Sequence, residues 1–536
     1  MKTKQIAILA AIVIASVTAC KKNKIVPDVV VPPVVTPPVT TPTTSRADLS
    51  RDSIFLYAKE VYLWNDKLPT YEVFNPRKYT SSATDLTNYQ QELFDITKYS
   101  NPFEYKAGYT SSKYSYIFDR ANKNPTAFVP TAISSVDLEG NGNDLGLKLG
   151  AYGTSSSDQN AYALFATAVY PGSPAALAGM VRSDRISKVN GRTLGANFST
   201  DRDFINTAFA ANTITIEGTK YVNGVAGTTF TVSLTKASYK SNPVYTSKVF
   251  TVGAKKVGYL AYARFSNMDN SKPAFDAAFN TFSSSGVTDL IIDLRYNGGG
   301  YVNTAKYLID LIAPATANGS VMFAEYYNAT MQGGNARIMS NQPLLDANDK
   351  IRYQNGRMLT YADVSYTVAN NTEIFEKQGP LSNITNVVFI ISESTASASE
   401  LVINSLKPFM NVKLVGETSY GKPVGFFPIR IENKYDVYYS MFTTKNSLGQ
   451  GDYYDGFTPD VVEDFDNPLY NFGDAKEDNI AAALNILSPG TPVTATAVKT
   501  MSIGGRSVNV QSLAPMKPIV DGNEFVGMIQ TKHKLK

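Results

Sequence analysis

The stretch from Val387 to Gly425 constrains the fold of this chain more than any other part of it. It opens with an apolar, β-branched run, Val387 to Ile391, which has the length and composition of a buried strand. Ser397 follows a turn of small residues, and Glu400 stands three positions later, the spacing of a helix capping box. A second buried strand is expected at residues 412–415. The pattern therefore predicts a strand, a helix that begins at Ser397, and another strand.

Lys422 lies in a glycine-flanked turn after the second strand, so it is expected at the same end of the sheet as Ser397. The chain has one histidine, His533, which lies near the C-terminus in a lysine-rich tail, and one cysteine, Cys20. This argues against a Ser-His-Asp triad and thiol catalysis, and a single histidine cannot form a histidine metal cluster. Lysine can act as the base if it is deprotonated. Its pKa must then fall by roughly 3 units from about 10.4, which burial can achieve at a cost of about 4 kcal/mol.

A plainer interpretation is an ordinary capping box and a solvated lysine. However, TASASE around Ser397, followed 25 residues later by the lysine of GETSYGK, resembles the core of the C-terminal processing (tail-specific) peptidases, the S41 serine peptidase family. The chain is most similar to Bacteroidetes-type members. This resemblance implies that Ser397 is the nucleophile and Lys422 the general base.

The run VTDLIIDLRYNGGG brings a buried strand into a glycine turn. It resembles the DLRxNxGG element of the same family, in which backbone N–H groups approach the substrate carbonyl. The resemblance implies that Gly298 and Gly299 stabilise the oxyanion, with the N–H of Ala398 as a further candidate donor. A phosphate loop is the competing interpretation, but the GxxxxGK[ST] spacing is absent.

Two positions depart from the family pattern. Phe426 stands where many bacterial members carry a glutamine that orients the base, and Pro408 stands where some carry an aspartate. Because a lysine has no tautomer to fix, a third member is less necessary than for histidine. The identity of the base is therefore better defined by the sequence than its orientation.

The first 19 residues have a basic start and an apolar run, which is typical of a secretory signal. The sequence VTAC resembles a bacterial lipobox and predicts cleavage before Cys20 and lipidation of its thiol, the alternative being a plain signal peptide. The expected location is the bacterial cell envelope, with a lipid anchor in the outer membrane, on its periplasmic or surface face. The sequence VVVPPVVTPPVTTPTT then predicts an extended tether.

Beyond the tether we expect a multidomain α+β protein with four further parts. The chain begins with a signal peptide (1–19) and a linker (20–48). The four parts that follow are a small N-terminal helical region (49–130), a PDZ-like β domain (136–240), a layered α/β peptidase core of crotonase/ClpP-like type (247–487) and a C-terminal tail without an assigned role (488–536). The PDZ-like domain is identified from a resemblance at residues 170–191 and at Leu145, Gly146 and Leu147. The last three resemble a carboxylate-binding loop for a peptide C-terminus. The alternative is a degenerate domain that only supports the core.

The net charge is +4, from 50 basic and 46 acidic residues, and nothing concentrates it into a nucleic-acid site. No metal or cofactor is expected. The predicted function is a serine endopeptidase with a Ser-Lys dyad that cleaves exported proteins or peptides and recognises their free C-termini. Two alternatives stay open, a catalytically silent lipid-anchored peptide-binding protein and a crotonase-like acyl enzyme. The export signal disfavours the second, because coenzyme A is not expected outside the cytoplasm.

Overall fold

The computed structural model describes residues 45–121, 136–154, 160–346, 349–494, 500–503, 505–516 and 525–536. The predicted signal peptide, Cys20 and nearly all of the predicted linker lie outside this part. Helix α1 (Arg46–Val61) takes up the last three residues of the predicted linker range, 46–48. Among the helices of the described residues, none is long and apolar enough to cross a membrane.

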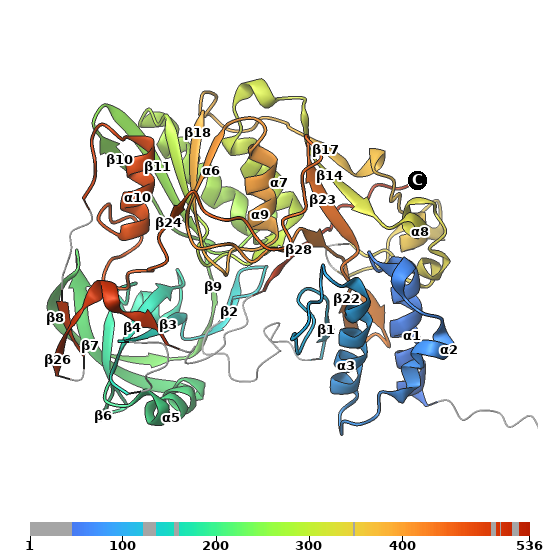
Figure 1. Ribbon diagram of the computed structural model, residues 1–536, viewed down its shortest axis with the longest axis horizontal. Coiled ribbons are helices and arrows are strands. Elements are labelled where there is room, and N and C mark those ends of the chain that lie inside the picture. Colours follow the sequence, from blue (N-terminus) through green and yellow to red (C-terminus); the bar gives the residue numbers. More distant parts are fainter. Residues whose placement is uncertain are drawn as a thin grey trace, which may run out of the picture. The chain divides into compact units, whose positions relative to one another are not determined.

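A six-stranded sheet forms the centre of the C-terminal half of the chain (Figure 1). Its order is β10-β11-β12-β18-β19-β24, and only the β10 and β11 pair is antiparallel. Strands β11, β12 and β18 are buried almost throughout, which suits a sheet covered on both faces. The strands span Val244–Val252, Lys255–Tyr262, Asp289–Asp293, Asn386–Ile391, Asn411–Gly416 and Val461–Val462.

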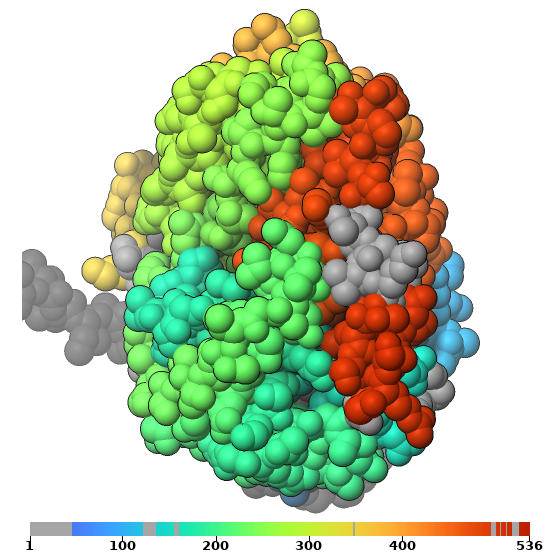
Figure 2. All heavy atoms as spheres, turned by 90° about the vertical axis from the view of Figure 1, so that its left-hand side faces the viewer, coloured from blue at the N-terminus to red at the C-terminus, as the bar shows by residue number. Residues whose placement is uncertain are grey.

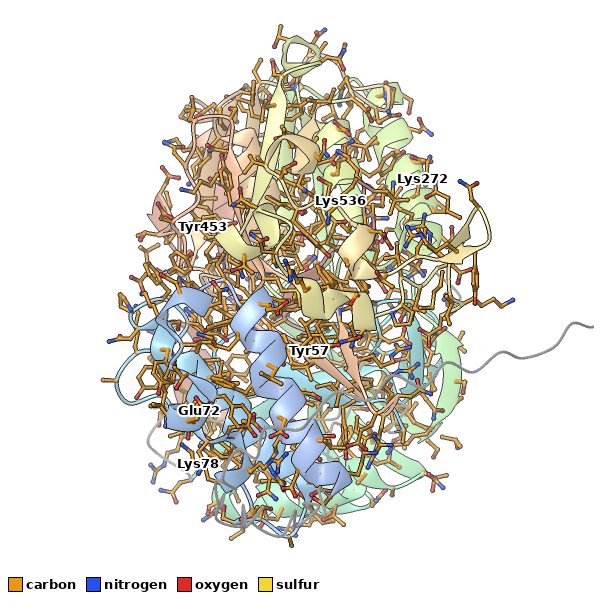
Figure 3. The ribbon with its side chains drawn as sticks, turned by 90° about the vertical axis from the view of Figure 1, so that its right-hand side faces the viewer. Tyr57, Glu72, Lys78, Lys272, Tyr453 and Lys536 are labelled. Carbon is orange, nitrogen blue, oxygen red and sulfur yellow. The ribbon has the colours of Figure 1, made fainter. Side chains whose placement is uncertain are left out.

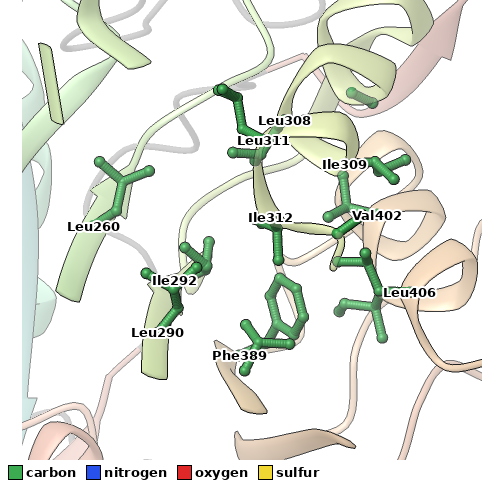
Figure 4. Packing of buried hydrophobic residues seen from close by; sticks show 14 of the residues in the cluster. Leu260, Leu290, Ile292, Leu308, Ile309, Leu311, Ile312, Phe389, Val402 and Leu406 are labelled. Carbon is green, nitrogen blue, oxygen red and sulfur yellow. The ribbon is translucent and has the colours of Figure 1, made fainter. Parts of the chain in front are cut away.

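Helices cover both faces of this sheet. Leu290, Ile292 and Phe389 pack against three helices on one face. Figure 4 shows these residues with side chains of two of the helices, α7 and α9. Ile291 and Val388 point to the other face, where they pack against a fourth helix, α10. This alternation along β12 and β18 confirms the predicted layered α/β core. The helices are α6 (Met268–Ser284), α7 (Val302–Ile312) and α9 (Ala398–Leu406) on the first face and α10 (Asp478–Leu487) on the second.

A seven-stranded, largely antiparallel sheet precedes the core, within the range predicted to be PDZ-like. Its order is β27-β3-β4-β5-β7-β8, and β6 pairs with β5. The strand β27 comes from the far C-terminal part of the chain. The elements are β2 (Asn141–Asp144), β3 (Leu147–Gly153), β4 (Tyr162–Val169), α4 (Pro174–Leu177), β5 (Arg185–Val189), β6 (Arg192–Thr193), α5 (Phe198–Ala210), β7 (Thr213–Val222), β8 (Val225–Thr235) and β9 (Ala237–Lys240).

The N-terminal helical region is present as predicted. Its longer helices are α1 and α3 (Asp85–Thr97), and α1 begins three residues before the expected start of the region at residue 49. Tyr57 of α1 is labelled in Figure 3 and accepts a hydrogen bond from Gln342. This region shares a hydrophobic core with two small sheets and α8. The remaining elements of the region and of the two small sheets, with α8, are α2 (Tyr71–Phe74), β1 (Tyr116–Asp119), β14 (Val321–Tyr327), α8 (Ala329–Gln332), β17 (Thr372–Ile374), β20 (Val424–Gly425), β21 (Ile429–Ile431), β22 (Tyr435–Tyr438) and β23 (Phe442–Asn446).

The C-terminal tail adds short strands to several parts of the molecule. Figure 2 shows the red hairpin of β25 and β26 on the surface, below the orange-red α10 in this view. Further on, β27 pairs with β3, and β28 pairs with β13. The bounds are β13 (Gly299–Tyr301), β25 (Thr500–Ile503), β26 (Arg506–Asn509), β27 (Ala514–Pro515) and β28 (Gly527–Ile529), and a separate two-stranded hairpin joins β15 (Tyr353–Gln354) and β16 (Arg357–Met358).

Three parallel strands determine where the candidate site lies. β12 pairs with β18, and β18 pairs with β19, all in parallel. Their carboxyl ends therefore lie at one edge of the sheet. The glycine turn follows β12, Ser397 follows β18, and Lys422 follows β19.

Candidate active site

Ser397 occupies a strained corner between a strand and a helix. It is the N-cap residue of α9, with φ 59° and ψ −107°, and it follows the buried strand β18. A non-glycine residue with such a backbone conformation is disfavoured and persists only when the surrounding structure enforces it. Strained strand-to-helix turns of this kind expose a serine nucleophile in hydrolases. The prediction that Ser397 starts a helix is confirmed.

The hydroxyl of Ser397 is buried without a hydrogen-bond partner among the described residues. Its own backbone N–H is satisfied, because Glu400 Oε2 accepts it at 2.8 Å, but the side chain makes no cap bond of its own. A buried hydroxyl without a partner costs stability. The site therefore keeps this oxygen free at the expense of stability, as a reacting group requires.

Lys422 is buried, with 1% of its surface exposed, and is not the solvated charge of the plainer interpretation. Its Nζ donates to the carbonyl oxygens of Val526 at 2.9 Å and Tyr114 at 3.3 Å, and it lies 4.6 Å from the ring centroid of Phe426. Burial lowers the pKa of Lys422 to about 7, although Glu104 and Glu400, two buried carboxylates described below, favour the charged form of the lysine. A substantial fraction of this lysine is therefore neutral near pH 7, as a general base must be.

Ser397 and Lys422 lie at the same edge of the sheet but are not hydrogen-bonded to each other. The lysine instead directs N–H groups to two carbonyls. A neutral amine has two N–H donors and one lone pair. When the two carbonyls accept both N–H groups, the lone pair points in the remaining tetrahedral direction. Backbone carbonyls thus supply the acceptors that orient Lys422. Phe426, which stands where many family members carry a glutamine, contributes only an aromatic ring.

Glu400 joins the two loops that carry these residues. Its buried carboxylate accepts the backbone N–H groups of Ser397 (2.8 Å), Lys422 (2.8 Å) and Gly421 (2.7 Å), and the hydroxyl of Ser419 (2.6 Å). Burial raises the pKa of Glu400, and these four donors oppose the rise. The sequence indicated Glu400 only as a helix cap, although its place inside the TASASE motif was the available signal.

A second buried carboxylate, Glu104, fixes the segment that faces Lys422. It accepts the N–H groups of Tyr114 at 3.2 Å and Ser115 at 2.6 Å, and the hydroxyl of Tyr62 at 2.9 Å. This holds the Tyr114 carbonyl that accepts the lysine. Nothing in the local sequence NPFEYKAG indicated this role, because it depends on contacts between distant segments.

The glycine turn lies against the serine loop. A Cβ atom at Gly299, where φ is +110°, would stand 3.1 Å from the backbone nitrogen of Ala398. The N–H of Gly299 donates to Asn297 Oδ1 at 2.9 Å. That leaves Gly298 and Ala398 as the candidate oxyanion donors, since Ala398 is the first residue of α9 and its N–H has no acceptor within the helix. Pro408 lies beyond the end of α9 and contributes no carboxylate.

The predicted carboxylate-binding loop of the β-rich region is engaged internally. Leu145 and Leu147 are buried in the region's own core. The N–H of Gly146 donates to Asp144 Oδ1 at 2.7 Å, and a Cβ at Gly146 would stand 1.9 Å from that of Ser173. In this state the loop therefore offers neither a free N–H at Gly146 nor exposed leucine side chains.

A buried ion-pair network connects the β-rich region with the glycine turn. Arg182 donates to Asp466 at 2.6 Å and to the hydroxyl of Tyr296 at 2.7 Å, and Arg295 also donates to Asp466, at 2.7 Å. Although burial opposes it, the two guanidinium groups hold the pKa of Asp466 well below its usual value. Arg295 and Tyr296 directly precede the turn, so its position is coupled to Arg182.

A cavity of about 780 Å³ reaches the lysine side of the site. Lys422, Tyr114, Tyr301 and Val526 are among its lining residues, whereas Ser397 is not. Within the described residues, no group of histidine, cysteine and carboxylate side chains could hold a metal ion. At this edge of the sheet the structure brings together a serine, a buried lysine and backbone N–H donors.

Comparison with known proteins finds similarity to one peptidase family. Residues 256–463 match the model of peptidase family S41. The chain is 25% identical over 266 residues to the chloroplastic C-terminal processing peptidase of Tetradesmus obliquus, covering 47% of this chain and 46% of the relative. It is 26% identical over 259 residues to the carboxyl-terminal-processing protease of Picosynechococcus sp., covering 47% and 49%. The chain thus spans about half the length of the curated relatives it matches.

A solved structure that is similar across most of the chain shows the same fold. It is a candidate S41 protease from Bacteroides fragilis, with a TM-score of 0.54 and 22% identity over 82% of this chain and 97% of that one. This similarity supports the fold. The chain therefore contains a peptidase family S41 domain, as the sequence motifs predicted.

Proposed function

We propose that this protein is a serine endopeptidase in which Ser397 attacks the scissile carbonyl carbon and Lys422 Nζ takes the hydroxyl proton. The backbone N–H groups of Gly298 and Ala398 would stabilise the oxyanion, and the lysine would return its proton to the leaving amine. The observation that carries the proposal is the strained serine with a free, buried hydroxyl beside a buried lysine whose pKa is lowered to about 7. The relatives' names support peptide hydrolysis.

The substrates of this activity are proposed to be exported proteins or peptides with free C-termini. The support is the C-terminal processing named for the relatives and the PDZ-like sequence features that precede the core. The matching test compares an unstructured substrate with the same substrate amidated at its C-terminus. Equal rates for the two would overturn recognition of the free carboxylate.

Membrane attachment through Cys20 is proposed from the lipobox-like sequence alone. An acyl chain contributes about 0.8 kcal/mol per buried CH₂ to membrane binding. Cys20→Ser should therefore release the exported protein from membranes or leave it unprocessed. Unchanged membrane association on fractionation would contradict the anchor.

The catalytic proposal is tested by hydrolysis of an unstructured protein substrate. Ser397→Ala and Lys422→Ala should each abolish cleavage while circular dichroism shows a native fold. A peptide-binding protein without catalysis would show no cleavage in the wild type either. Cleavage that survives Ser397→Ala would show that another group is the nucleophile.

A further inference from the structure

The C-terminal tail lies in the candidate active site as a β-strand. Strand β28 pairs in parallel with β13, with Gly527 opposite Gly299, and the N–H of Gly527 donates to the carbonyl of Gly298 at 2.9 Å. On its other side, Phe426 donates its N–H to the carbonyl of Met528 at 3.1 Å. The tail thus fills a slot one strand wide between the glycine turn and the segment after Lys422.

The tail backbone contacts the groups assigned to catalysis. Lys422 Nζ donates to the carbonyl oxygen of Val526 at 2.9 Å. A Cβ atom at Gly298 would stand 2.3 Å from the carbonyl oxygen of Phe525, and one at Gly299 would stand 2.2 Å from that of Gly527. The glycines therefore leave room for a passing peptide backbone, and this backbone belongs to the chain itself.

No edge of β13 is open to another peptide in this state, as far as the described residues show. Its other edge is taken by Phe265, whose N–H donates to Gly299 at 2.8 Å and whose carbonyl accepts from Tyr301 at 2.9 Å. A substrate that binds by adding a strand needs a free edge. Ser397 is fully buried and does not line the cavity beside Lys422. A substrate strand can pair with β13 only where β28 now lies.

The slot has a defined shape for two consecutive side chains. A Cβ at Gly527 would stand 2.4 Å from the Phe426 ring, so this position favours glycine. Met528 is fully buried in the core cluster that also contains Phe389 and Ala398. The slot therefore accepts an extended peptide with glycine followed by a long, flexible apolar side chain.

The tail is held on both sides of this strand. Before it, β27 covers the edge of β3, and Met516 donates its N–H to Ala151 at 2.9 Å. After it, Ser365 donates to the carbonyl of Lys534 at 2.8 Å, and Lys536 donates to that of Asp363 at 2.9 Å. Figure 3 shows Lys536 over the body of the protein. Strand β28 is therefore a peptide segment of the chain itself that is held in the slot by contacts on both sides.

The geometry points to an autoinhibited state, in which residues 525–530 occupy the peptide groove between β13 and Phe426 and must be displaced before an extended peptide reaches Ser397. This inference rests on the proposed function for the role of Ser397. The tail is not positioned as a substrate for self-cleavage, because the Val526 carbonyl accepts from the lysine and the serine hydroxyl has no partner.

The test uses the full chain with Met528→Asp, which places a carboxylate in the apolar slot. Thr531→Asp is the matched control, since Thr531 is exposed three residues further on. Met528→Asp should accelerate both peptide hydrolysis and labelling of Ser397 by a small fluorophosphonate about tenfold or more, and Thr531→Asp should change neither. Equal or slower rates in a natively folded Met528→Asp protein would overturn the inference.

A second variant and a competing peptide complete the test of autoinhibition. If circular dichroism shows that Met528→Asp does not fold, Gly527→Ala takes its place, because its Cβ meets the Phe426 ring. The synthetic peptide FVGMIQ, which copies residues 525–530, should return the accelerated rates toward the wild-type values, and its glycine-to-valine version should not. Failure of FVGMIQ to slow the accelerated variant would overturn occupancy of the groove.

Binding of labelled FVGMIQ is measured in parallel in Ser397→Ala combined with Met528→Asp. Binding without any hydrolysis by the catalytically intact protein would contradict the proposed function and support the groove. Hydrolysis without binding, and without acceleration by Met528→Asp, would contradict autoinhibition and leave the peptidase assignment standing.

Discussion

Ser397 and Lys422 share a single acceptor, the Oε2 atom of Glu400, which receives the backbone N–H of each residue at 2.8 Å. The nucleophile loop and the base loop are thereby fixed to one buried carboxylate. Their relative position depends on this residue and not on a direct contact between the two side chains. Glu400 is a positioning residue in this account.

Glu400→Gln should lower kcat by about 10–100-fold with little change in KM. An amide keeps one acceptor oxygen but turns an NH₂ group toward N–H donors, so at least one buried donor loses its partner, at about 1–3 kcal/mol. Steady-state kinetics and urea unfolding measure the two effects. Glu393→Gln, at an exposed position in the loop before Ser397, is the control and should change neither. A wild-type kcat in Glu400→Gln would contradict the positioning role.

The pH dependence should follow Lys422. Burial lowers its pKa to about 7, and only the neutral amine accepts a proton, so kcat/KM should rise about tenfold per pH unit below 7 and level off above it. Because the folded-state pKa lies below the unfolded value of about 10.4, this lysine also makes stability rise with pH between about 7 and 10. A pH–rate profile that stays flat from pH 5 to 8 would contradict a lysine base.

Arg182→Ala should destabilise the protein by about 3–5 kcal/mol. The substitution leaves Asp466 with one buried guanidinium partner and removes hydrogen bonds to the Tyr470 carbonyl and the Tyr296 hydroxyl. Arg506→Ala, at an exposed position on β26, should have an effect below about 0.5 kcal/mol. Urea unfolding compares the two. Equal midpoints would show that the network carries no stability.

A substitution at Gly146 is a poor probe of C-terminal recognition in this fold. With φ at +77° and Ser173 Cβ 1.9 Å from a built Cβ, any side chain disturbs the loop whatever its charge. Amidation of the substrate tests recognition without altering the protein. We expect amidated substrates to show a higher KM with an unchanged kcat, and identical kinetics would show that the β-rich region does not read the carboxylate.

The sequence predicted the parts of the fold that are local and periodic. The strands at 387–391 and 412–415, the helix after Ser397 and the layered core follow from apolar runs and capping residues, and the structure confirms them. The burial of Lys422 and its lowered pKa also agree with what a lysine base needs. The strands and the helix are set by residues close together in the chain, whereas the burial of Lys422 depends on distant segments.

The contacts that complete the site could not be predicted in this way. Tyr114 and Val526 meet Lys422 from segments 308 and 104 residues away, through backbone carbonyls that leave no mark on residue type. The sequence assigns the tail no role, because its strands are two to four residues long and two of them are stabilised by pairing with β3 and β13. Its place in the groove becomes visible only in three dimensions.

The most direct test of the central claim is to map the fluorophosphonate adduct by mass spectrometry after labelling to completion. We expect one adduct, on Ser397, and no adduct in Lys422→Arg, because arginine keeps the charge but cannot accept the proton. An adduct on a different residue, or labelling of Lys422→Arg at a tenth of the wild-type rate or faster, would contradict the assignment of Ser397 and Lys422 as nucleophile and base.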